Sequence, residues 1–484
     1  MEQAEAEAIY QQGGDAVVSV LLALSAQNER LEAQVQTLTA RVVRQDERIA
    51  TLERELGRSS RNSSQPPSAD PPSTPPGRGK DPSGRRQGGQ PGHEGKGRPL
   101  LPAWAVDEII EHWPADCDCG HVFSDADRIA AGEPARRQVE ELPVMAVRVT
   151  EHRCQRVCCP GCGARRTGQL PAQVAASAFG PRLQAAVVTL SVRNRISRRD
   201  VVELCEQLFS SRICTGTVDA ILARSADALT GPCEDLLDRV RSSRALNMDE
   251  TGWRLRGSQR ALWGMFSDRH AILQITPSRH DDHAKALLAT SAAIVTSDRW
   301  WAYNHLPVKR RQVCWSDLQR DFEFHAEGRG IEKEIGRAGL AVCDELFSAW
   351  EIYQHTGDRR ELRRRVGLLQ RQLKPVLREH AGKKIRYRQG RRFARGLLKL
   401  WPALWTFASH ADVQPTNNHA ERALRSAVIY RKLSLGSQSE HGEQRIARLL
   451  SAHTTCRLQR RSLHAYLIDV LAVRAAGQPA PLLA

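Results

Sequence analysis

The chain has 484 residues and a formal net charge of +16, because 71 lysines and arginines outnumber 55 acidic residues. This length exceeds one ordinary hydrophobic core, so we expect about two to four structural units. A surface this basic favours polyanionic partners, above all nucleic acid, because neutralised phosphates release counterions. No apolar run is long enough to span a bilayer, so we expect no membrane partner.

The N-terminal stretch 17–24 is mostly apolar, but four acidic residues precede it. A secretory signal peptide carries positive charge at this place, so we expect none. The chain should then stay in the cytoplasm, where its 12 cysteines remain reduced or bind metal.

The first segment, residues 1–56, is expected to be a helix that self-associates as a coiled coil. Apolar residues follow one another at alternating steps of three and four, and Gln45 is the one polar residue in this seam. The seam residues are Leu31, Val35, Leu38, Val42, Ile49, Leu52 and Leu56. The stripe is narrower than the apolar face of a typical globular helix. It therefore favours a homodimer over a single helix that packs on its own domain.

Residues 57–101 change abruptly to a sequence rich in Pro, Gly, Ser and Arg. Such a composition cannot bury a core, so we predict a disordered linker. Its basic residues either contact phosphates or belong to a solvated tether, and both interpretations stay open. They are Arg78, Lys80, Arg85, Arg86, Lys96 and Arg98.

Residues 102–175 are expected to form a small, strand-like zinc-binding segment. It contains two close cysteine pairs, each followed by a glycine that permits a tight turn around a metal. Four thiolates suit a tetrahedral structural zinc site and leave no open position for a substrate. The pairs are Cys117 with Cys119, and Cys159 with Cys162. His121 or His152 could replace one cysteine, and the alternative is that the thiols bind no metal.

Residues 176–242 are predicted to be helical. Ser197 is a plausible N-cap, and a polar break at 210–212 separates two runs of helical periodicity. Two short helices around a tight turn suit a helix-turn-helix that binds DNA, and the alternative is a helical hairpin that only packs. The candidate DNA contacts beside the first helix are Arg193, Arg195, Arg198 and Arg199.

A catalytic domain is predicted at 243–432, where the pattern changes to strands. Three strands are expected at 245–254, 261–266 and 271–275, followed by a helix at 281–292 and a fourth strand at 293–298. This order matches the first half of an RNase H-like α/β fold, in which the first and fourth strands are neighbours. Asp249 then lies on the first strand and Asp298 at the end of the fourth.

A third acid, Glu421, lies at the start of a later helix. Residues 326–410 before it are mostly helical and basic, with runs such as Arg363-Arg364-Arg365 and Lys383-Lys384, and we interpret them as a helical insertion. In an RNase H-like scheme, a helix after the sheet brings one carboxylate back to the two strand acids. Residues 433–484 are then a C-terminal helical segment.

Three carboxylates suit metal-dependent cleavage of a phosphodiester. Two Mg²⁺ ions about 3.5–4 Å apart activate the attacking hydroxyl and stabilise the leaving oxygen. Mg²⁺ takes oxygen ligands and only a few carboxylates, so two strand acids and one helix acid suffice. Each acid also has a structural alternative. Asp249 and Asp298 could close strands into turns, and Glu421 could form a capping box with Asn418.

The chain also carries a series of short motifs in a fixed order. They are Asn62-Ser63-Ser64-Gln65-Pro66-Pro67-Ser68, Gly89-Gln90-Pro91-Gly92-His93-Glu94-Gly95, Asp249-Glu250-Thr251-Gly252-Trp253, Ser297-Asp298, Cys314-Trp315-Ser316-Asp317-Leu318-Gln319-Arg320-Asp321, Asn417-Asn418-His419-Ala420-Glu421-Arg422, Arg431-Lys432 and Gly436-Ser437-Gln438-Ser439-Glu440. Together with the N-terminal helix and the paired cysteines, this series resembles the transposases of the insertion sequence 66 family. Single motifs of this kind are weak, but so many in order are specific.

The resemblance implies a DNA transposase of a bacterial insertion sequence, associated with the nucleoid. Asp249, Asp298 and Glu421 would form a DDE triad that holds two Mg²⁺ or Mn²⁺ ions on an RNase H-like domain. The expected activity is binding of terminal inverted repeats, strand cleavage and strand transfer, which amounts to DNA transposition and recombination. Structural Zn²⁺, at least a homodimer and small accessory proteins of the same element are implied as well. Further DNA contacts are expected at Arg422, Arg425, Arg431 and Lys432.

Two positions depart from the family pattern. Asp317 stands where the family usually has histidine, and Gln319 stands where it usually has arginine. The alternative functions are a non-catalytic DNA-binding repressor, such as an inactivated copy, and a structure-selective nuclease of the same fold. All three acids are present, which favours an enzyme.

Overall fold

The computed structural model describes residues 3–56, 58–59, 98–129, 132–143, 145, 147–175, 177–328, 331–382 and 388–483. Contacts divide the chain into two compact units. The first contains residues 1–75, 179–195 and 222–484, and the second contains residues 76–178 and 196–221. The large mixed sheet and the C-terminal helices all belong to the first unit.

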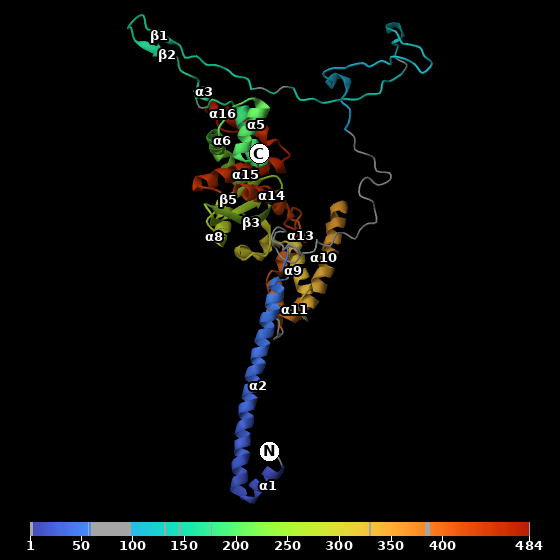
Figure 1. Ribbon diagram of the computed structural model, residues 1–484, viewed down its shortest axis with the longest axis vertical. Coiled ribbons are helices and arrows are strands. Elements are labelled where there is room, and N and C mark those ends of the chain that lie inside the picture. Colours follow the sequence, from blue (N-terminus) through green and yellow to red (C-terminus); the bar gives the residue numbers. More distant parts are fainter. Residues whose placement is uncertain are drawn as a thin grey trace. The chain divides into compact units, whose positions relative to one another are not determined.

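The N-terminal segment is helical, as predicted. A short helix α1 (Gln3–Gln11) precedes one long helix α2 (Gly14–Leu56), drawn in blue in Figure 1. The apolar stripe is exposed in the single chain, where Leu31 is 50% and Leu38 is 57% accessible to solvent. The helix is confirmed, and its self-association stays a prediction. Most of the predicted linker, residues 60–97, lies outside the described residues, as do Lys383 and Lys384.

The expectation of a strand-like segment at 102–175 is met over only a few residues. Strands β1 (Arg156–Cys158) and β2 (Arg165–Thr167) form an antiparallel hairpin, with Arg156 opposite Thr167. The other regular elements are the 3-10 turns η2 (Ala103–Ala105) and η3 (Asp125–Asp127) and a short helix α3 (Ala172–Ala175). Most of the remaining described backbone of this segment has no regular secondary structure, so the prediction overstated its strand content.

The region predicted to be helical is mostly so, and the predicted break at 210–212 lies in a non-helical segment at 210–214. The region contains α4 (Pro181–Val188), the π-helical turn η4 (Thr189–Arg193), α5 (Arg198–Phe209), α6 (Thr215–Ala228) and α7 (Thr230–Arg241). The predicted N-cap is confirmed, because the Ser197 side chain accepts a hydrogen bond from the Asp200 N–H. Helix α5 ends at Ser210, which adopts left-handed backbone geometry with φ 53°.

The sheet of the first unit has five strands in the order β5-β4-β3-β6-β7. The strands are β3 (Ala245–Leu255), β4 (Ser258–Phe266), β5 (Ala271–Thr276), β6 (Ile294–Ser297) and β7 (Arg311–Val313). Strands β3, β4 and β5 pair antiparallel, whereas β6 and β7 run parallel to β3. The predicted three strands, helix α8 (Asp281–Leu288) and fourth strand are all found. The fifth strand, β7, was not predicted.

Side chains alternate between the two faces of the sheet along β3. Leu246, Met248 and Glu250 are buried, whereas Asn247 and Asp249 between them are only partly buried. Successive side chains of a strand point to opposite faces of the sheet. Asp249 therefore shares a face with Asn247 and lies opposite the face of Glu250.

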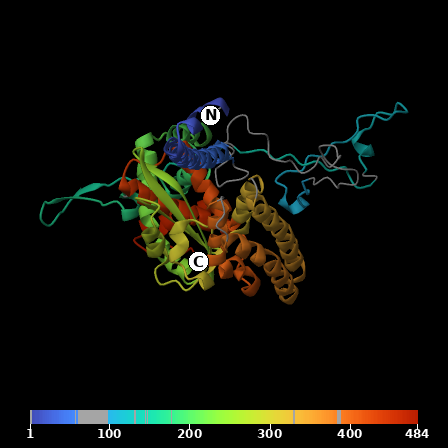
Figure 2. The same ribbon diagram turned by 90° about the horizontal axis from the view of Figure 1, so that it is seen from below.

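The outer edge of the sheet, strand β5, is covered by the C-terminal helix α15 (Glu440–Leu458). The Ser451 hydroxyl accepts a hydrogen bond from the Leu273 N–H, and the Thr455 hydroxyl exchanges hydrogen bonds of 3.0 and 3.1 Å with the Ala271 backbone. Side-chain hydroxyls thus satisfy backbone groups that an edge strand otherwise leaves open to other chains. Figure 2 shows these C-terminal helices, in red, beside the green-to-yellow strands.

The predicted insertion is a helical subdomain with its own apolar core. The insertion predicted at 326–410 contains α10 (Ile331–Thr356), α11 (Arg359–Gly382), α12 (Arg388–Lys399), η7 (Trp401–Leu404) and α13 (Thr406–Ser409). Before it, η5 (Trp301–His305) and η6 (Val308–Arg310) lie between β6 and β7, and α9 (Trp315–Ala326) follows β7. Trp315, Phe322 and Phe407 lie at the centre of the core. Gly339 allows α10 to approach α9, because a Cβ there would come within 2.0 Å of the Phe322 ring.

Three helices follow the insertion, and the last two lie in the C-terminal helical segment predicted at 433–484. They are α14 (Asn418–Ser434), α15 and α16 (Leu463–Ala475). In the part of the chain that the structure describes, every helix is too short or too polar to cross a membrane.

Candidate metal centre

The two strand acids meet at the junction of β3 and β6. These strands pair in parallel, with Ala245 opposite Ile294 and Asn247 opposite Thr296. Continuing this register by two residues places Asp249 opposite Asp298, which directly follows β6. Neighbouring strands lie about 4.8 Å apart, so the two carboxylates emerge from adjacent backbone positions.

Helix α14 brings Glu421 to the same strand, and Asn417 fixes its start. The buried Asn417 side chain accepts a hydrogen bond from Asn247 Nδ2 (2.9 Å) and donates one to the Met248 carbonyl (2.8 Å). Its backbone N–H donates to Cys314 Sγ at 3.2 Å. Asn417 therefore binds the backbone immediately before Asp249, and Glu421 follows one helical turn later.

Two further contacts hold α14 against the sheet. His419 Nε2 lies 2.7 Å from the Ser267 carbonyl at the end of β4. Near the other end of the helix, the Arg431 guanidinium donates to the Gly252 carbonyl and to Thr251 Oγ1. The helix is thus fixed at both ends, and the acid in its first turn has a defined position.

Burial and nearby negative charges raise the pKa of both strand acids. Burial raises the pKa of Asp249 well above its usual range, and the charges of Glu250, Asp298 and Glu421 add to this effect. Burial likewise raises the pKa of Asp298 to about 7, helped by Glu250 and opposed by the Trp300 N–H, which donates to Asp298 Oδ1. The positive charge of Arg311 also lowers the pKa of Asp298, but the net shift is upward.

Glu421 lies in a mixed electrostatic environment. Burial raises its pKa first, and the charge of Asp317 raises it further. Arg320 opposes this effect, as do Arg425 and Arg422 on α14 itself. The Glu421 side chain remains 41% exposed, so solvent and ligands reach it.

Asp317 lies close to Glu421, and Arg320 contacts both carboxylates. Cys314, Asp317 and Glu421 place one ligand atom each within 4.8 Å of one another, a criterion that Asp249, Asp298 and Glu421 do not all meet. The Arg320 guanidinium contacts Asp317 and lies 3.8 Å from Glu421 Oε1. Burial raises the pKa of the Cys314 thiol well above its usual range, so it stays protonated and is a poor ligand for a hard cation.

A fourth carboxylate, Glu250, supports the site from the opposite face of β3. The buried Tyr303 hydroxyl donates to Glu250 Oε2 at 2.6 Å, and Arg279 donates to Oε1 at 2.5 Å. The Arg279 guanidinium also lies 5.0 Å from the centre of the Trp300 ring, next to Asp298. Sequence reasoning identified Glu250 only as part of a motif and missed its partners, which lie about 30 and 50 positions away.

The geometry of α14 does not support the alternative in which Glu421 forms a capping box with Asn418. The N-cap residue is Asn417 rather than Asn418, and its side chain makes no capping hydrogen bond to the first turn. The Asn417 side chain binds β3 instead. Glu421 is therefore free of a capping role.

The four cysteines expected to bind zinc form two separate local pairs. Backbone and side-chain hydrogen bonds from Cys119 lower the pKa of Cys117, and those from Cys162 contribute to lowering the pKa of Cys159. Among the described residues, the two pairs do not form a group of three or more ligand atoms within 4.8 Å. Each pair could supply two of the four thiolate ligands of a zinc site, and the complete site stays a prediction.

The predicted DNA contacts differ in their surroundings. Arg198 and Arg199 are both exposed, and Arg198 forms an ion pair with Asp219. Arg422 and Arg425 are exposed on α14 beside Glu421, and Lys432 is exposed near the end of that helix. Arg431 is engaged with β3, so its position is explained by packing. Arg193 and Arg195 line a cavity together with arginines of the C-terminal helices.

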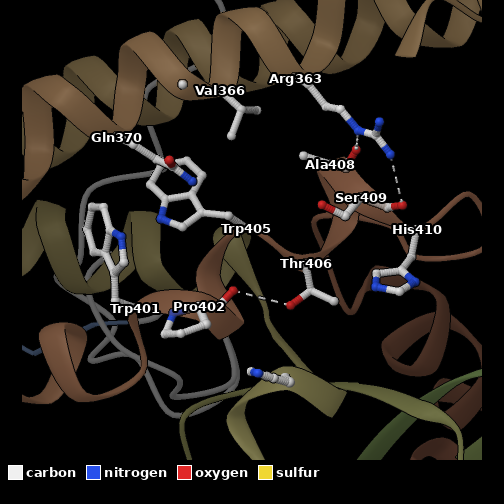
Figure 3. A pocket seen from close by; sticks show the side chains of 12 residues that line it. Arg363, Val366, Gln370, Trp401, Pro402, Trp405, Thr406, Ala408, Ser409 and His410 are labelled. Carbon is white, nitrogen blue, oxygen red and sulfur yellow. Dashed lines mark hydrogen bonds between the residues drawn. The ribbon is translucent and has the colours of Figure 1, made fainter. Parts of the chain in front are cut away.

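A separate cavity of about 560 Å³ lies in the helical insertion (Figure 3). It is lined by the indoles of Trp401 and Trp405, whose ring centres are 5.5 Å apart. Arg363 on α11 donates to the carbonyls of Ala408 and Ser409 at its rim. The lining includes none of the three predicted acids, so this cavity is distinct from the acidic cluster.

The fold and the site together define an α+β protein with an acidic cluster where two parallel strands and a helix meet. A model of the Transposase IS66 family matches residues 176–445, more than half of the chain. The chain therefore belongs to the IS66 family of transposases. A family of unknown function, DUF6444, matches residues 21–99. The chain is also similar to the uncharacterized protein y4hP of Sinorhizobium fredii, with 23% identity over 427 residues that cover 79% of this chain and 75% of that relative.

Proposed function

We propose that this chain is a DDE transposase that cuts and joins the ends of an insertion sequence with divalent cations. The observation that supports the proposal is the parallel β3–β6 register, whose continuation by two residues would pair Asp249 with Asp298, together with the anchoring of α14 on β3 by Asn417. Membership of the IS66 transposase family supports it. The strand order β5-β4-β3-β6-β7 supports an RNase H-like catalytic domain.

The residues present fit Mg²⁺ or Mn²⁺. Asp249, Asp298 and Glu421 offer carboxylate oxygens, the ligands that these hard cations prefer. The raised pKa values of all three acids arise partly from negative charges nearby, which bound cations would offset. When bound, the ions supply activation of the attacking hydroxyl and stabilisation of the leaving oxygen.

The chain's own residues position these ligands. Asn417 and Arg431 fix α14 on β3, so that Glu421 stays beside the strand acids. Arg320 holds the Glu421 carboxylate from the α9 side, where it also contacts Asp317. Glu250, tied to Tyr303 and Arg279, fixes the underside of β3. The site thus has two strand ligands and one helix ligand that is more exposed to solvent.

DNA is the proposed substrate, with the element's terminal inverted repeats as the specific partner. The net charge of +16 supports a polyanionic partner. A non-catalytic repressor remains the alternative function, and an intact set of three acids argues against it. We further propose that α2 pairs two chains, since its exposed stripe of leucines and valines suits a coiled coil. Structural Zn²⁺ at the two cysteine pairs and accessory proteins of the same element complete the proposal.

The test is a strand-transfer assay with the full chain and labelled DNA that flanks its gene. We expect cleavage and joining of the element end with Mg²⁺ and none with EDTA. Asp249→Asn should abolish both reactions and leave end binding unchanged in a gel-shift assay, because only the ligand charge is lost. Asp268→Asn, an exposed acid in the β4–β5 turn, serves as the matched control and should behave as the wild type. Joining at the wild-type rate by Asp249→Asn contradicts the site, and DNA binding without any cleavage by the wild type supports the repressor.

A further inference from the structure

A second candidate site is a cavity of about 650 Å³ that lies away from the carboxylates. One side comes from residues 193–195, at the end of η4, and the other from residues 453–463, where α15 ends and α16 begins. The second segment lies beyond residue 445, where the match to the transposase family ends. Both segments belong to the first compact unit.

Arginines dominate the lining, and no carboxylate accompanies them. The cavity is lined by Arg193, Arg195, Arg457, Arg460 and Arg461, together with Asn194, His453, Cys456, Ser462 and Leu463. In the part of the chain that the structure describes, none of these five guanidinium groups forms an ion pair, although other arginines of the same helices do, such as Arg445 with Asp227. Five positive charges that line one cavity repel one another, and a bound anion would reduce this repulsion.

The floor of the cavity is buried and uncharged. Cys456 and Leu463 are buried, and His453 is only 5% exposed. Burial lowers the pKa of His453 to about 4, helped by the charges of Arg193 and Arg457, so the ring is neutral at pH 7. Its side chain has no hydrogen-bond partner among the described residues. A neutral imidazole at the floor can donate one hydrogen bond to an anionic oxygen.

Two of the arginines stand at sharp turns of the backbone. Arg195 and Arg460 have φ values of 61° and 55°, in the left-handed region that residues with a Cβ adopt rarely. At the end of α15, the Arg461 N–H donates to the Cys456 carbonyl at 2.8 Å, which closes the turn. These turns set the arginines of both segments around the same space.

We propose that this cavity binds backbone phosphates of duplex DNA and is a second contact region of the transposase, separate from its acidic centre. The inference rests on the proposed function for the identity of the anion. Planar guanidinium groups bind phosphate oxygens in a bidentate manner, and several of them around one concave surface exceed what a single small anion needs. The same chemistry would accept a free nucleotide or inorganic phosphate, which the experiment separates from DNA.

The experiment compares two double variants of the full chain. Arg193→Gln/Arg457→Gln removes one charge from each side of the cavity, while Arg461 is kept because it lies 5.0 Å from the Tyr466 ring and supports packing. Arg30→Gln/Arg44→Gln removes the same charge from the exposed surface of α2. Duplex DNA binding is followed by fluorescence anisotropy between 0.05 and roughly 0.3 M salt, a range chosen so that the slope of affinity against salt is measurable. Circular dichroism verifies that both variants fold.

Each lost phosphate contact lowers the slope of log affinity against log salt by about 0.9. The cavity variant should therefore lose about 1.8 from the slope and bind about 30-fold more weakly at 0.15 M salt. The α2 variant should keep the wild-type slope. Equal losses in both variants overturn the proposal, because general charge would then explain binding.

Two further readouts separate the possible failures. Calorimetry with pyrophosphate and a deoxynucleoside triphosphate tests whether the cavity binds a free anion instead of DNA. The DNA assignment is overturned if the wild type binds one of these anions tightly and the cavity variant loses that binding but keeps its DNA affinity. The same preparations are assayed for strand transfer. If the wild type joins DNA ends while the cavity variant keeps full DNA affinity, only the cavity proposal fails. If the cavity variant loses DNA affinity while the wild type joins nothing, only the proposed function fails.

Discussion

Replacing Asp298 by Asn should stabilise the metal-free protein. The charged Asp298 carboxylate is partly buried beside other acids, and both effects disfavour its ionised form in the folded chain. An Asn side chain removes the charge and still accepts the hydrogen bond from the Trp300 N–H, because Oδ1 is retained. The local structure should therefore persist while the electrostatic cost disappears.

The size and pH dependence of this effect follow from the pKa of Asp298. Its value rises from 3.8 to about 7 on folding, and at 1.36 kcal/mol per pKa unit this corresponds to about 4 kcal/mol. Because the folded pKa is the higher one, the folded state holds its proton between these two values while the unfolded state releases it. The destabilisation is thus absent below about pH 4, grows to about 2 kcal/mol at pH 5 and is complete above about pH 7.

The assay is thermal unfolding of wild type and Asp298→Asn at pH 5 and pH 8 in EDTA. At pH 8 the variant should unfold roughly 8–16 °C higher, given about 2–4 °C per kcal/mol for a unit of this size. At pH 5 the difference should shrink by about half or more. Mg²⁺ at pH 8 should raise the wild-type midpoint and not that of the variant. A variant that is less stable than the wild type at pH 8, or an equal difference at both pH values, would refute the reasoning.

Three more predictions address other parts of the molecule. Asn417→Ala leaves Asn247 Nδ2 and the Met248 carbonyl without their partner, so it should lower the free energy of unfolding by about 1–3 kcal/mol, as measured by urea unfolding. It should also reduce strand transfer, while DNA affinity in a gel-shift assay stays unchanged. Strand transfer at the wild-type rate would contradict a positioning role for Asn417. Leu38→Lys in the exposed stripe of α2 should convert a dimer to a monomer in analytical ultracentrifugation, whereas wild type that sediments as a monomer contradicts the coiled coil. Cys159→Ser should lower the zinc content of the purified chain from one atom to none by elemental analysis, and zinc-free wild type disproves the structural site.

The strands that carry the two aspartates were predictable because their pattern is local. The strand-like segments 245–254, 261–266 and 271–275 are followed by turns with Gly, Ser and Asp, and Asp249 and Asp298 lie on and directly after their predicted strands. Strand β7 escaped prediction because two of its three residues, Arg311 and Gln312, are polar and yet fully buried. Gln312 binds the backbone of Leu404 and Phe407, about 90 positions away, and Arg311 binds the backbone of Tyr303 and Asp298. No local pattern reveals such burial.

The position of Glu421 was predicted from a resemblance, whereas the residues that fix it were not. Asn417 was recognised only as part of a motif, although it makes the contacts that join α14 to a strand about 170 positions earlier. Asp317 was recognised as a departure from the family, and its link to Glu421 through Arg320 depends on how α9 packs beside α14. Pairings across such separations arise from tertiary packing, which periodicity does not encode.

The most direct test of the shared metal centre is a crystal of the full chain soaked in Mn²⁺ and measured for anomalous scattering. The account predicts Mn²⁺ bound by carboxylate oxygens of Asp249, Asp298 and Glu421, with two ions about 3.5–4 Å apart once a DNA end is present. Ions held by Asp317 and Glu421 alone, with both strand aspartates unliganded, would contradict it.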